Sequence, residues 1–247
     1  MLKCYIIQIE PEKLTGDRKD LLEQLLPEER REKLYRLKDE KRRNCYLISS
    51  AFMQYGISKA LNLPMRDIRY RYGANGKPML AEPLSETGGG IDFSLSHSGD
   101  YAVFAISDKP VGVDIERKTD GCEAVAKRFF REEEYKDMMG ADTEEERKRR
   151  FLEYWTMKEA YVKRDGRGLQ IPLTSFRVIR REQGLSYAEL LGSESKPVPI
   201  VFFQEQEYGI SICSEADELF EENVIPCGIE DIIQHIRTDV LHKALIK

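Results

Sequence analysis

The sequence predicts an α+β protein built from two similar halves. In each half, a strand-like segment is followed by helical segments and then by segments with the alternation typical of antiparallel strands. A turn at Lys109-Pro110 separates the halves. The chain has 247 residues, of which 41% are hydrophobic, so it can bury a core as one large domain or as two small ones.

The first half opens with a predicted strand at residues 2–9. A short helix follows at 20–26, and Pro27 ends it because proline lacks the amide hydrogen that a helix interior needs. From there the apolar spacing is helical over residues 28–61, with a break near Asp39.

Basic residues are concentrated at the start of this helical stretch. They could form a solvated helix face, paired with nearby glutamates, or they could bind the phosphate groups of a ligand. The residues alone favour the solvated face and leave the second interpretation open. The basic residues are Arg30, Arg31, Lys33, Arg36, Lys38, Lys41, Arg42 and Arg43.

A short strand is predicted at residues 68–72, and a turn containing Asn75-Gly76 follows it at 73–78. This turn does not match a Walker A nucleotide-binding loop. Its glycines have the wrong spacing, and Pro78 stands where that loop needs Ser or Thr. From its residues alone, the turn only reverses the chain.

The most regular alternation lies at residues 91–116 and predicts a three-stranded antiparallel meander. Its third strand carries Asp114 and Glu116, which should project to the same side, about 7 Å apart along the strand. Two such acids raise each other's pKa unless a cation lies between them, and a hard divalent cation with oxygen ligands would satisfy both. A solvated strand edge is the ordinary alternative.

In the second half, helices are predicted at residues 122–139 and 143–164. Along the second helix, Trp155, Glu159 and Lys163 are spaced four residues apart and therefore share one face. From spacing alone, Glu159 and Lys163 could be an ordinary exposed ion pair. Strands are expected at 176–180, 199–204 and 208–213, and an amphipathic helix at 228–245.

Composition narrows the cellular setting. The net charge of −5 indicates no general affinity for nucleic acid. The five cysteines are scattered, with no zinc-site spacing, which favours a reducing compartment. No stretch has the length of a membrane span, and the first ten residues lack the pattern of a signal peptide. The sequence therefore predicts a cytoplasmic protein with neither nucleic acid nor membrane as a partner.

Four short blocks occur in order at residues 75–78 (NGKP), 93–99 (FSLSHSG), 112–116 (GVDIE) and 155–163 (WTMKEAYVK). In this order and at these separations, the blocks resemble the 4′-phosphopantetheinyl transferases of the large two-lobed type that activates surfactin synthetase. Weaker similarity continues at 127–135 and at 166–169, so the resemblance covers most of the chain.

The resemblance implies an enzyme that moves the phosphopantetheine arm of coenzyme A onto a serine of an apo acyl or peptidyl carrier protein. Magnesium is the expected cofactor, and adenosine 3′,5′-bisphosphate is the expected leaving group. Because the carrier supplies the serine, no activated nucleophile is expected in this chain.

The same resemblance implies two lobes related by a pseudo-twofold axis, each a small antiparallel sheet packed on a long helix. The expected first lobe, 1–109, holds the adenine and 3′-phosphate of the coenzyme. The expected second lobe, 110–227, carries the metal site and the catalytic helix, and a C-terminal helix follows at 228–247. A monomer is expected, with the coenzyme between the lobes.

Site residues also follow from the resemblance. The expected magnesium ligands are Asp114, Glu116 and Glu159. The expected catalytic residues are Glu159, Lys163, Lys158 and His97. The expected coenzyme contacts are Gly76, Lys77, Pro78, Ser96, His97, Arg31, Arg43, Lys158 and Lys163. For the 3′-phosphate, the candidates in the first lobe are Arg30, Arg31, Lys33, Arg43 and Asn44. The base that takes the serine proton stays open between Glu159, Glu134 and a water on the metal.

Two other functions stay open. A protein that only binds coenzyme A or a carrier would keep the fold, although it would have little need of the carboxylates together with Lys163. A different magnesium-dependent enzyme, such as a nucleotide hydrolase, is supported by the carboxylate pattern alone. The carrier is expected to dock near the cleft, with an acidic helix toward basic residues of this chain. The sequence does not indicate which carrier.

Overall fold

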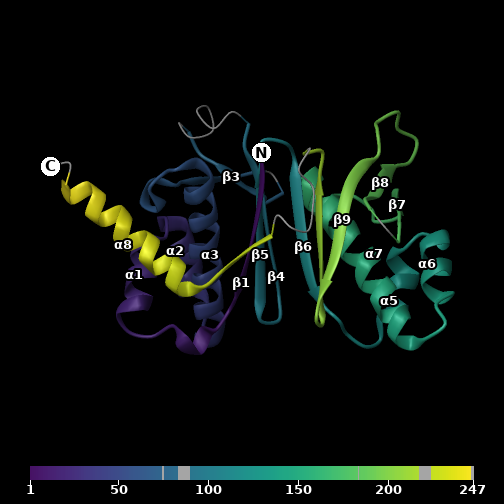
Figure 1. Ribbon diagram of the computed structural model, residues 1–247, viewed down its shortest axis with the longest axis horizontal. Coiled ribbons are helices and arrows are strands. Elements are labelled where there is room, and N and C mark those ends of the chain that lie inside the picture. The colour runs from purple at the N-terminus through teal and green to yellow at the C-terminus, as the bar shows by residue number, and fades with distance from the viewer. Residues whose placement is uncertain (74, 83–89, 183, 217–223, 246–247) are drawn as a thin grey trace.

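The computed structural model describes residues 1–245 apart from 74, 83–89, 183 and 217–223. It confirms the α+β class. Two β-sheets stand side by side in the middle of the molecule, and helices cover the outer side of each sheet (Figure 1). The facing sides of the sheets share an apolar layer that includes Val103 and Ala105 of one sheet and Val113 and Ile212 of the other. The order of layers is therefore helix, sheet, sheet, helix.

The first sheet has the strand order β11-β1-β5-β4. β1 is antiparallel to β5, and β5 forms a hairpin with β4, whereas β1 and β11 run parallel. The strands are β1 (Leu2–Gln8), β4 (Asp92–Ser98), β5 (Tyr101–Ser107) and β11 (Val224–Cys227), with β2 (Tyr70–Tyr72) and β3 (Pro78–Leu80) in a separate hairpin.

Helix α3 is the centre of the first lobe. Its middle turns are buried on all sides, as expected for a helix that is apolar around its whole circumference. Gly56 lets the ring of Phe104 approach closely, since a Cβ atom there would lie 2.4 Å from that ring. The predicted break is confirmed, because Asp39 caps α3 by accepting from the amide of Arg42 at 2.8 Å. The helices of this lobe are α1 (Asp17–Leu25), α2 (Glu28–Arg36) and α3 (Glu40–Leu61), with short 3₁₀ helices at Pro11–Lys13 and Met65–Asp67.

The second sheet has the order β6-β10-β9-β8-β7, with all neighbouring strands antiparallel. Helix α7 packs across it, and Thr143 caps α7 by accepting from the amide of Glu146. The strands are β6 (Val111–Arg117), β7 (Phe176–Ile179), β8 (Ser186–Leu190), β9 (Val198–Glu205) and β10 (Tyr208–Ser214). The helices are α5 (Cys122–Phe129), α6 (Glu132–Met139) and α7 (Glu144–Asp165), followed by a 3₁₀ turn at Gly168–Gln170.

Two predicted elements differ from the structure, and three short strands were not predicted. The meander is wrong in its third strand, because β6 leaves the first sheet and pairs with β10. The single helix predicted at 122–139 is two helices, separated at Phe130-Arg131. The unpredicted strands are β3, β8 and β11.

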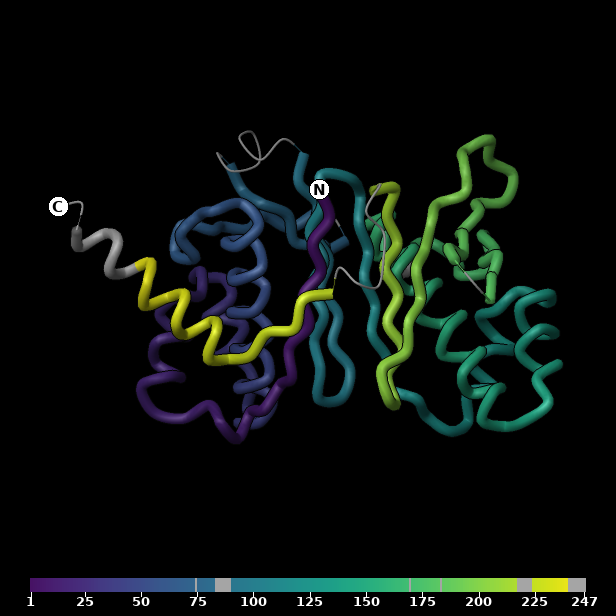
Figure 2. The backbone as a smooth tube through the Cα atoms, in the orientation of Figure 1, coloured from purple at the N-terminus to yellow at the C-terminus, as the bar shows by residue number. Residues whose placement is uncertain are grey.

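The end of the chain returns to the first lobe (Figure 2). β11 pairs with β1, so residues 224–227 belong to the first sheet and not to the second lobe, where the sequence placed them. Helix α8 (Ile229–Leu245) then buries Ile232 and Ile236 in the core around α3. His235 is hydrogen-bonded to Ser58 of α3 through Nε2 and Oγ, 2.7 Å apart. The C-terminal helix thus covers the first lobe.

Among the helices that the structure describes, none combines the length and the apolar character required to cross a lipid bilayer.

Candidate functional site

A cavity of about 1010 Å³ lies where the two lobes meet. Its walls come from α2, α3, the β2–β3 turn and β4 of the first lobe, and from α7 of the second. Six of the predicted site residues line it: Gly76, Lys77, Pro78, His97, Glu159 and Lys163. The structure therefore brings together segments from three of the four blocks.

The lobes are joined beside this cavity by an unusual pairing of β4 with β6. The two strands run parallel, and side chains of β4, instead of its backbone, accept hydrogen bonds from alternate amides of β6. The pairs are Asp92 with Val111 at 2.9 Å, Ser94 with Val113 at 3.1 Å and Ser98 with Arg117 at 3.1 Å. This seam holds the serines of the second block against the carboxylates of the third.

Both carboxylates of β6 point toward β4, as their spacing predicts. Asp114 is almost fully buried, and its Oδ1 accepts from Ser96 Oγ at 2.8 Å and from Lys163 Nζ at 2.6 Å. Glu116 is half-buried and accepts from Ser98 Oγ at 2.8 Å. The simple alternative of a solvated strand edge is therefore wrong for Asp114.

The three carboxylates of the site carry more negative charge than the nearby lysine offsets. Burial raises the pKa of Asp114, Glu116 and Glu159, and the negative charge of Asp114 raises that of Glu159 further. Glu159 has no hydrogen bond or ion pair with any residue that the structure describes. Among the described residues, Lys163 is the only nearby lysine that offsets the negative charge of these carboxylates, and it does so through an ion pair with Asp114.

This donor set fits a hard divalent cation. Asp114 Oδ2 is buried and has no hydrogen-bond partner among the residues that the structure describes, and carboxylate oxygens are the ligands that Mg²⁺ prefers. In the present conformation, however, no three His, Cys, Asp or Glu residues of the described chain are grouped closely enough to hold an ion. The ligand set of Asp114, Glu116 and Glu159 thus stays a prediction that the orphaned oxygen supports.

Ser96 and His97 lie on the same strand but face opposite ways. Ser96 is buried and bridges Lys163 and Asp114, accepting from Lys163 Nζ at 2.7 Å. His97 lies on the cavity wall, where partial burial and the ammonium of Lys163 lower its pKa. Lys77 lines the cavity, but its ammonium binds Asp92 Oδ2 at 2.7 Å. This ion pair makes Lys77 part of the contact between β4 and β6.

Lys158 is not in the site, which corrects the prediction of a catalytic and phosphate-binding role. Its side chain has no exposed surface and forms an ion pair with Glu134 at 2.9 Å. It also donates to the carbonyl of Leu173 at 2.7 Å. Lys158 is one position away from Glu159 around α7, so its side chain points into the second lobe. The same pairing buries Glu134 and excludes it as the base that accepts a substrate proton.

We expect replacement of Lys158 by Met to destabilise the protein by about 3–5 kcal/mol, because Glu134 would keep a buried charge without its partner. Equilibrium denaturation in urea measures this change. The control is Lys136→Met on α6, where only an exposed pair with Glu132 is lost and the stability should stay close to that of the wild type. Equal stabilities for the two variants would contradict a structural role for Lys158.

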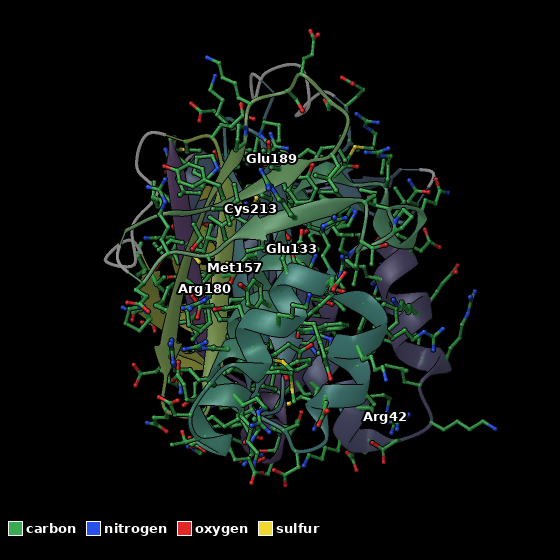
Figure 3. All side chains as sticks on the ribbon, turned by 90° about the vertical axis from the view of Figure 1, so that its right-hand side faces the viewer. Arg42, Glu133, Met157, Arg180, Glu189 and Cys213 are labelled. Atoms are coloured by element: carbon green, nitrogen blue, oxygen red, sulfur yellow. The ribbon has the colours of Figure 1, made fainter. Side chains whose placement is uncertain are left out.

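The basic residues that line the cavity match the predicted 3′-phosphate candidates only in part. Arg30 and Lys33 line it, together with Lys41 and Arg42, whereas Arg31, Arg43 and Asn44 are absent from its walls. Figure 3 views the molecule from the second lobe. Arg42 lies on the first lobe, behind α7, on which Met157 is labelled. The correction has a signal in the sequence. Arg30 lies four residues before the buried Leu34 and shares its inward face, which Arg31 does not.

Arg30 is the most enclosed of these cations. It is 8% exposed, donates to Ser50 Oγ at 3.1 Å, and its guanidinium lies 4.8 Å from the ring centre of Tyr70. Its Nε has no hydrogen-bond partner, and no ion pair joins it to a carboxylate of the described chain. An unpaired guanidinium in a cavity wall is suited to an anionic ligand.

Comparison with known proteins agrees with this arrangement. Residues 16–109 match a family model described as 4′-phosphopantetheinyl transferase, N-terminal. Residues 110–213 match one described as the 4′-phosphopantetheinyl transferase superfamily.

Similar curated proteins cover most of the chain. The 4′-phosphopantetheinyl transferase psf-1 of Bacillus pumilus is 32% identical over 86% of this chain and 90% of its own length. The 4′-phosphopantetheinyl transferase Sfp of Bacillus subtilis is 28% identical over 94% of this chain and the whole of its own length. The human L-aminoadipate-semialdehyde dehydrogenase-phosphopantetheinyl transferase is 31% identical over 47% of this chain and 40% of its own length. The chain therefore belongs to the 4′-phosphopantetheinyl transferase superfamily, and it is a transferase of the Sfp type.

Proposed function

We propose that this enzyme transfers 4′-phosphopantetheine from coenzyme A to a serine of an apo acyl or peptidyl carrier protein, with magnesium as cofactor. The serine oxygen bonds to the β-phosphorus, and the bond from that phosphorus to the bridging oxygen breaks. Adenosine 3′,5′-bisphosphate leaves, and the serine proton passes to a base. One observation carries the proposal: the interlobe cavity places Glu159, Lys163 and His97 together beside the buried carboxylate of Asp114.

The residues divide the work of phosphoryl transfer. Asp114, Glu116 and Glu159 would hold magnesium, which when bound offsets the negative charge that builds on the phosphoryl oxygens. Lys163 and His97 lie on the cavity wall and are placed to contact the diphosphate. Ser96 fixes the carboxylate of Asp114 from the first lobe.

Glu159 is the side chain best placed to accept the serine proton. It lines the cavity, where it can reach the serine of the carrier, and a water on the metal is the other candidate. Glu134 is buried against Lys158 away from the cavity.

The first lobe would hold the nucleotide end of the coenzyme. Gly76 and Pro78 lie in the cavity wall at the β2–β3 turn, where we place the adenine. For the 3′-phosphate we propose Arg30 with Lys33, Lys41 and Arg42, in place of Arg31 and Arg43. Arg30 supports this assignment because its charge is desolvated and unpaired among the described residues.

The carrier protein would reach the cavity mouth with an acidic helix toward its basic rim, and the enzyme would act as a monomer in the cytoplasm. Two lobes within one chain support the monomer, because both walls of the cavity come from the same polypeptide. Family membership argues against a protein that only binds the coenzyme, and so does Glu159 in the cavity wall.

The test is the intact mass of an apo carrier protein after incubation with the enzyme, coenzyme A and Mg²⁺. We expect a gain of one phosphopantetheine group, which a chelator prevents. Coenzyme A binding without a gain on acyl and peptidyl carriers alike would contradict the proposal. Phosphate release from nucleotides, with no change in the carrier, would favour a hydrolase instead.

A further inference from the structure

Lys163 is a residue of α7 whose ammonium contacts the buried carboxylate of Asp114. Its ammonium lies 2.6 Å from Asp114 Oδ1 and 2.7 Å from Ser96 Oγ, so it is held from both lobes. Asp114 is 2% exposed, and a carboxylate so deeply buried needs a positive partner. Lys163 is that partner.

The two oxygens of this carboxylate differ in their contacts. Oδ1 accepts two hydrogen bonds, whereas Oδ2 is buried and accepts none from the described residues. Glu116 and Glu159 stand close enough for their charges to act on this cluster. The ion pair thus leaves a negative site that is only partly neutralised, and a divalent cation entering it would meet the ammonium of Lys163.

The side chain of Lys163 is free to move elsewhere. It is 30% exposed, it lines the cavity, and a lysine ammonium sits on a flexible four-carbon stem. A phosphate group in the cavity would offer the ammonium a second anionic partner. When Lys163 turns to it, Asp114 loses its positive neighbour.

We propose that Lys163 competes with the divalent cation for Asp114, and that the diphosphate of coenzyme A ends this competition by taking the ammonium. This inference rests on the proposed function. It predicts a definite order: the free enzyme binds the metal weakly, and the coenzyme must bind before the metal site forms. Because coupling is reciprocal, the metal strengthens coenzyme binding by the same factor.

The test measures Mn²⁺ binding, with free Mn²⁺ counted by electron paramagnetic resonance, with and without coenzyme A. The neutral variant Lys163→Gln keeps a hydrogen-bond donor for Asp114 but removes the charge. We expect it to bind Mn²⁺ without coenzyme at least about tenfold more tightly than the wild type, within the usual range of coupling between sites. Lys163→Arg retains the charge and should bind Mn²⁺ as weakly as the wild type.

Loss of a positive charge elsewhere is the matched control. Lys136→Gln on α6 removes an exposed lysine paired with Glu132 and should leave Mn²⁺ affinity unchanged. If Lys163→Gln binds Mn²⁺ no more tightly than the wild type without coenzyme, the competition does not exist.

A measurement on the unmodified protein covers the case in which the glutamine variant fails to fold. The side-chain NMR signal of Lys163, identified by its absence from the arginine variant, should shift when coenzyme A is added without metal. An unchanged signal would overturn the inference. Failure of the proposed function appears separately, as carriers that gain no phosphopantetheine whatever the Mn²⁺ affinities are.

Discussion

Replacement of Glu159 by Gln is expected to lower the transfer rate by about 10²–10³-fold, the usual cost of removing one positioned electrostatic group. The stability of the folded protein should not decrease. Glu159 has no hydrogen bond or ion pair with the described residues, and burial together with repulsion from Asp114 raises its pKa. Neutralising it removes an unfavourable charge, so the melting temperature should stay equal or rise.

The prediction combines a lower transfer rate with an equal or higher melting temperature, so two measurements test it. Steady-state transfer to an apo carrier gives the rate, and thermal denaturation gives the stability of the same preparation. The control is Glu144→Gln in the first turn of α7, where the glutamate is exposed and pairs with Lys148. A Glu159 variant that lost stability together with activity would mean that this carboxylate has a structural role. An active variant would remove Glu159 from the site.

The sequence predicted the carboxylates because their placement depends on local geometry. Strand periodicity put Asp114 and Glu116 on one side of β6, and helical periodicity put Glu159 and Lys163 on one face of α7. The structure confirms both arrangements. The role of Lys158 was inferred from the resemblance, and neither a sequence motif nor helical periodicity shows which partner a side chain meets. That partner, Glu134, comes from a separate helix.

The parts of the fold that were missed depend on contacts between distant segments. The partner of β6 is β10, about ninety residues away, while its nearer neighbour β4 is bound through side chains. Alternation shows that β6 is a strand but not which strand it pairs with. β11 has four residues and contains Pro226, which argues against a strand interior, and it forms only because the edge of β1 is available.

The third sequence block also contains a packing constraint, at Gly112. A Cβ atom at this position would lie 1.9 Å from the carbonyl oxygen of Ala160 and 2.4 Å from the amide nitrogen of Arg164. Both contacts are with the backbone of α7, which cannot turn aside as a side chain could. Gly112 therefore allows β6 to lie directly against the helix that carries Glu159 and Lys163.

We accordingly expect Gly112→Ala to destabilise the protein by about 3 kcal/mol or more, at the upper end of overpacking effects. The control is Gly228→Ala, where the nearest atom would be 3.6 Å from the new Cβ, and we expect a change within about 0.5 kcal/mol. Denaturation in urea gives both values. Any Gly112→Ala protein that still folds must move α7 away from β6, which separates Lys163 from Asp114. Transfer activity should therefore fall even at temperatures where the variant is folded. Wild-type stability with wild-type activity would show that β6 and α7 do not need this close contact.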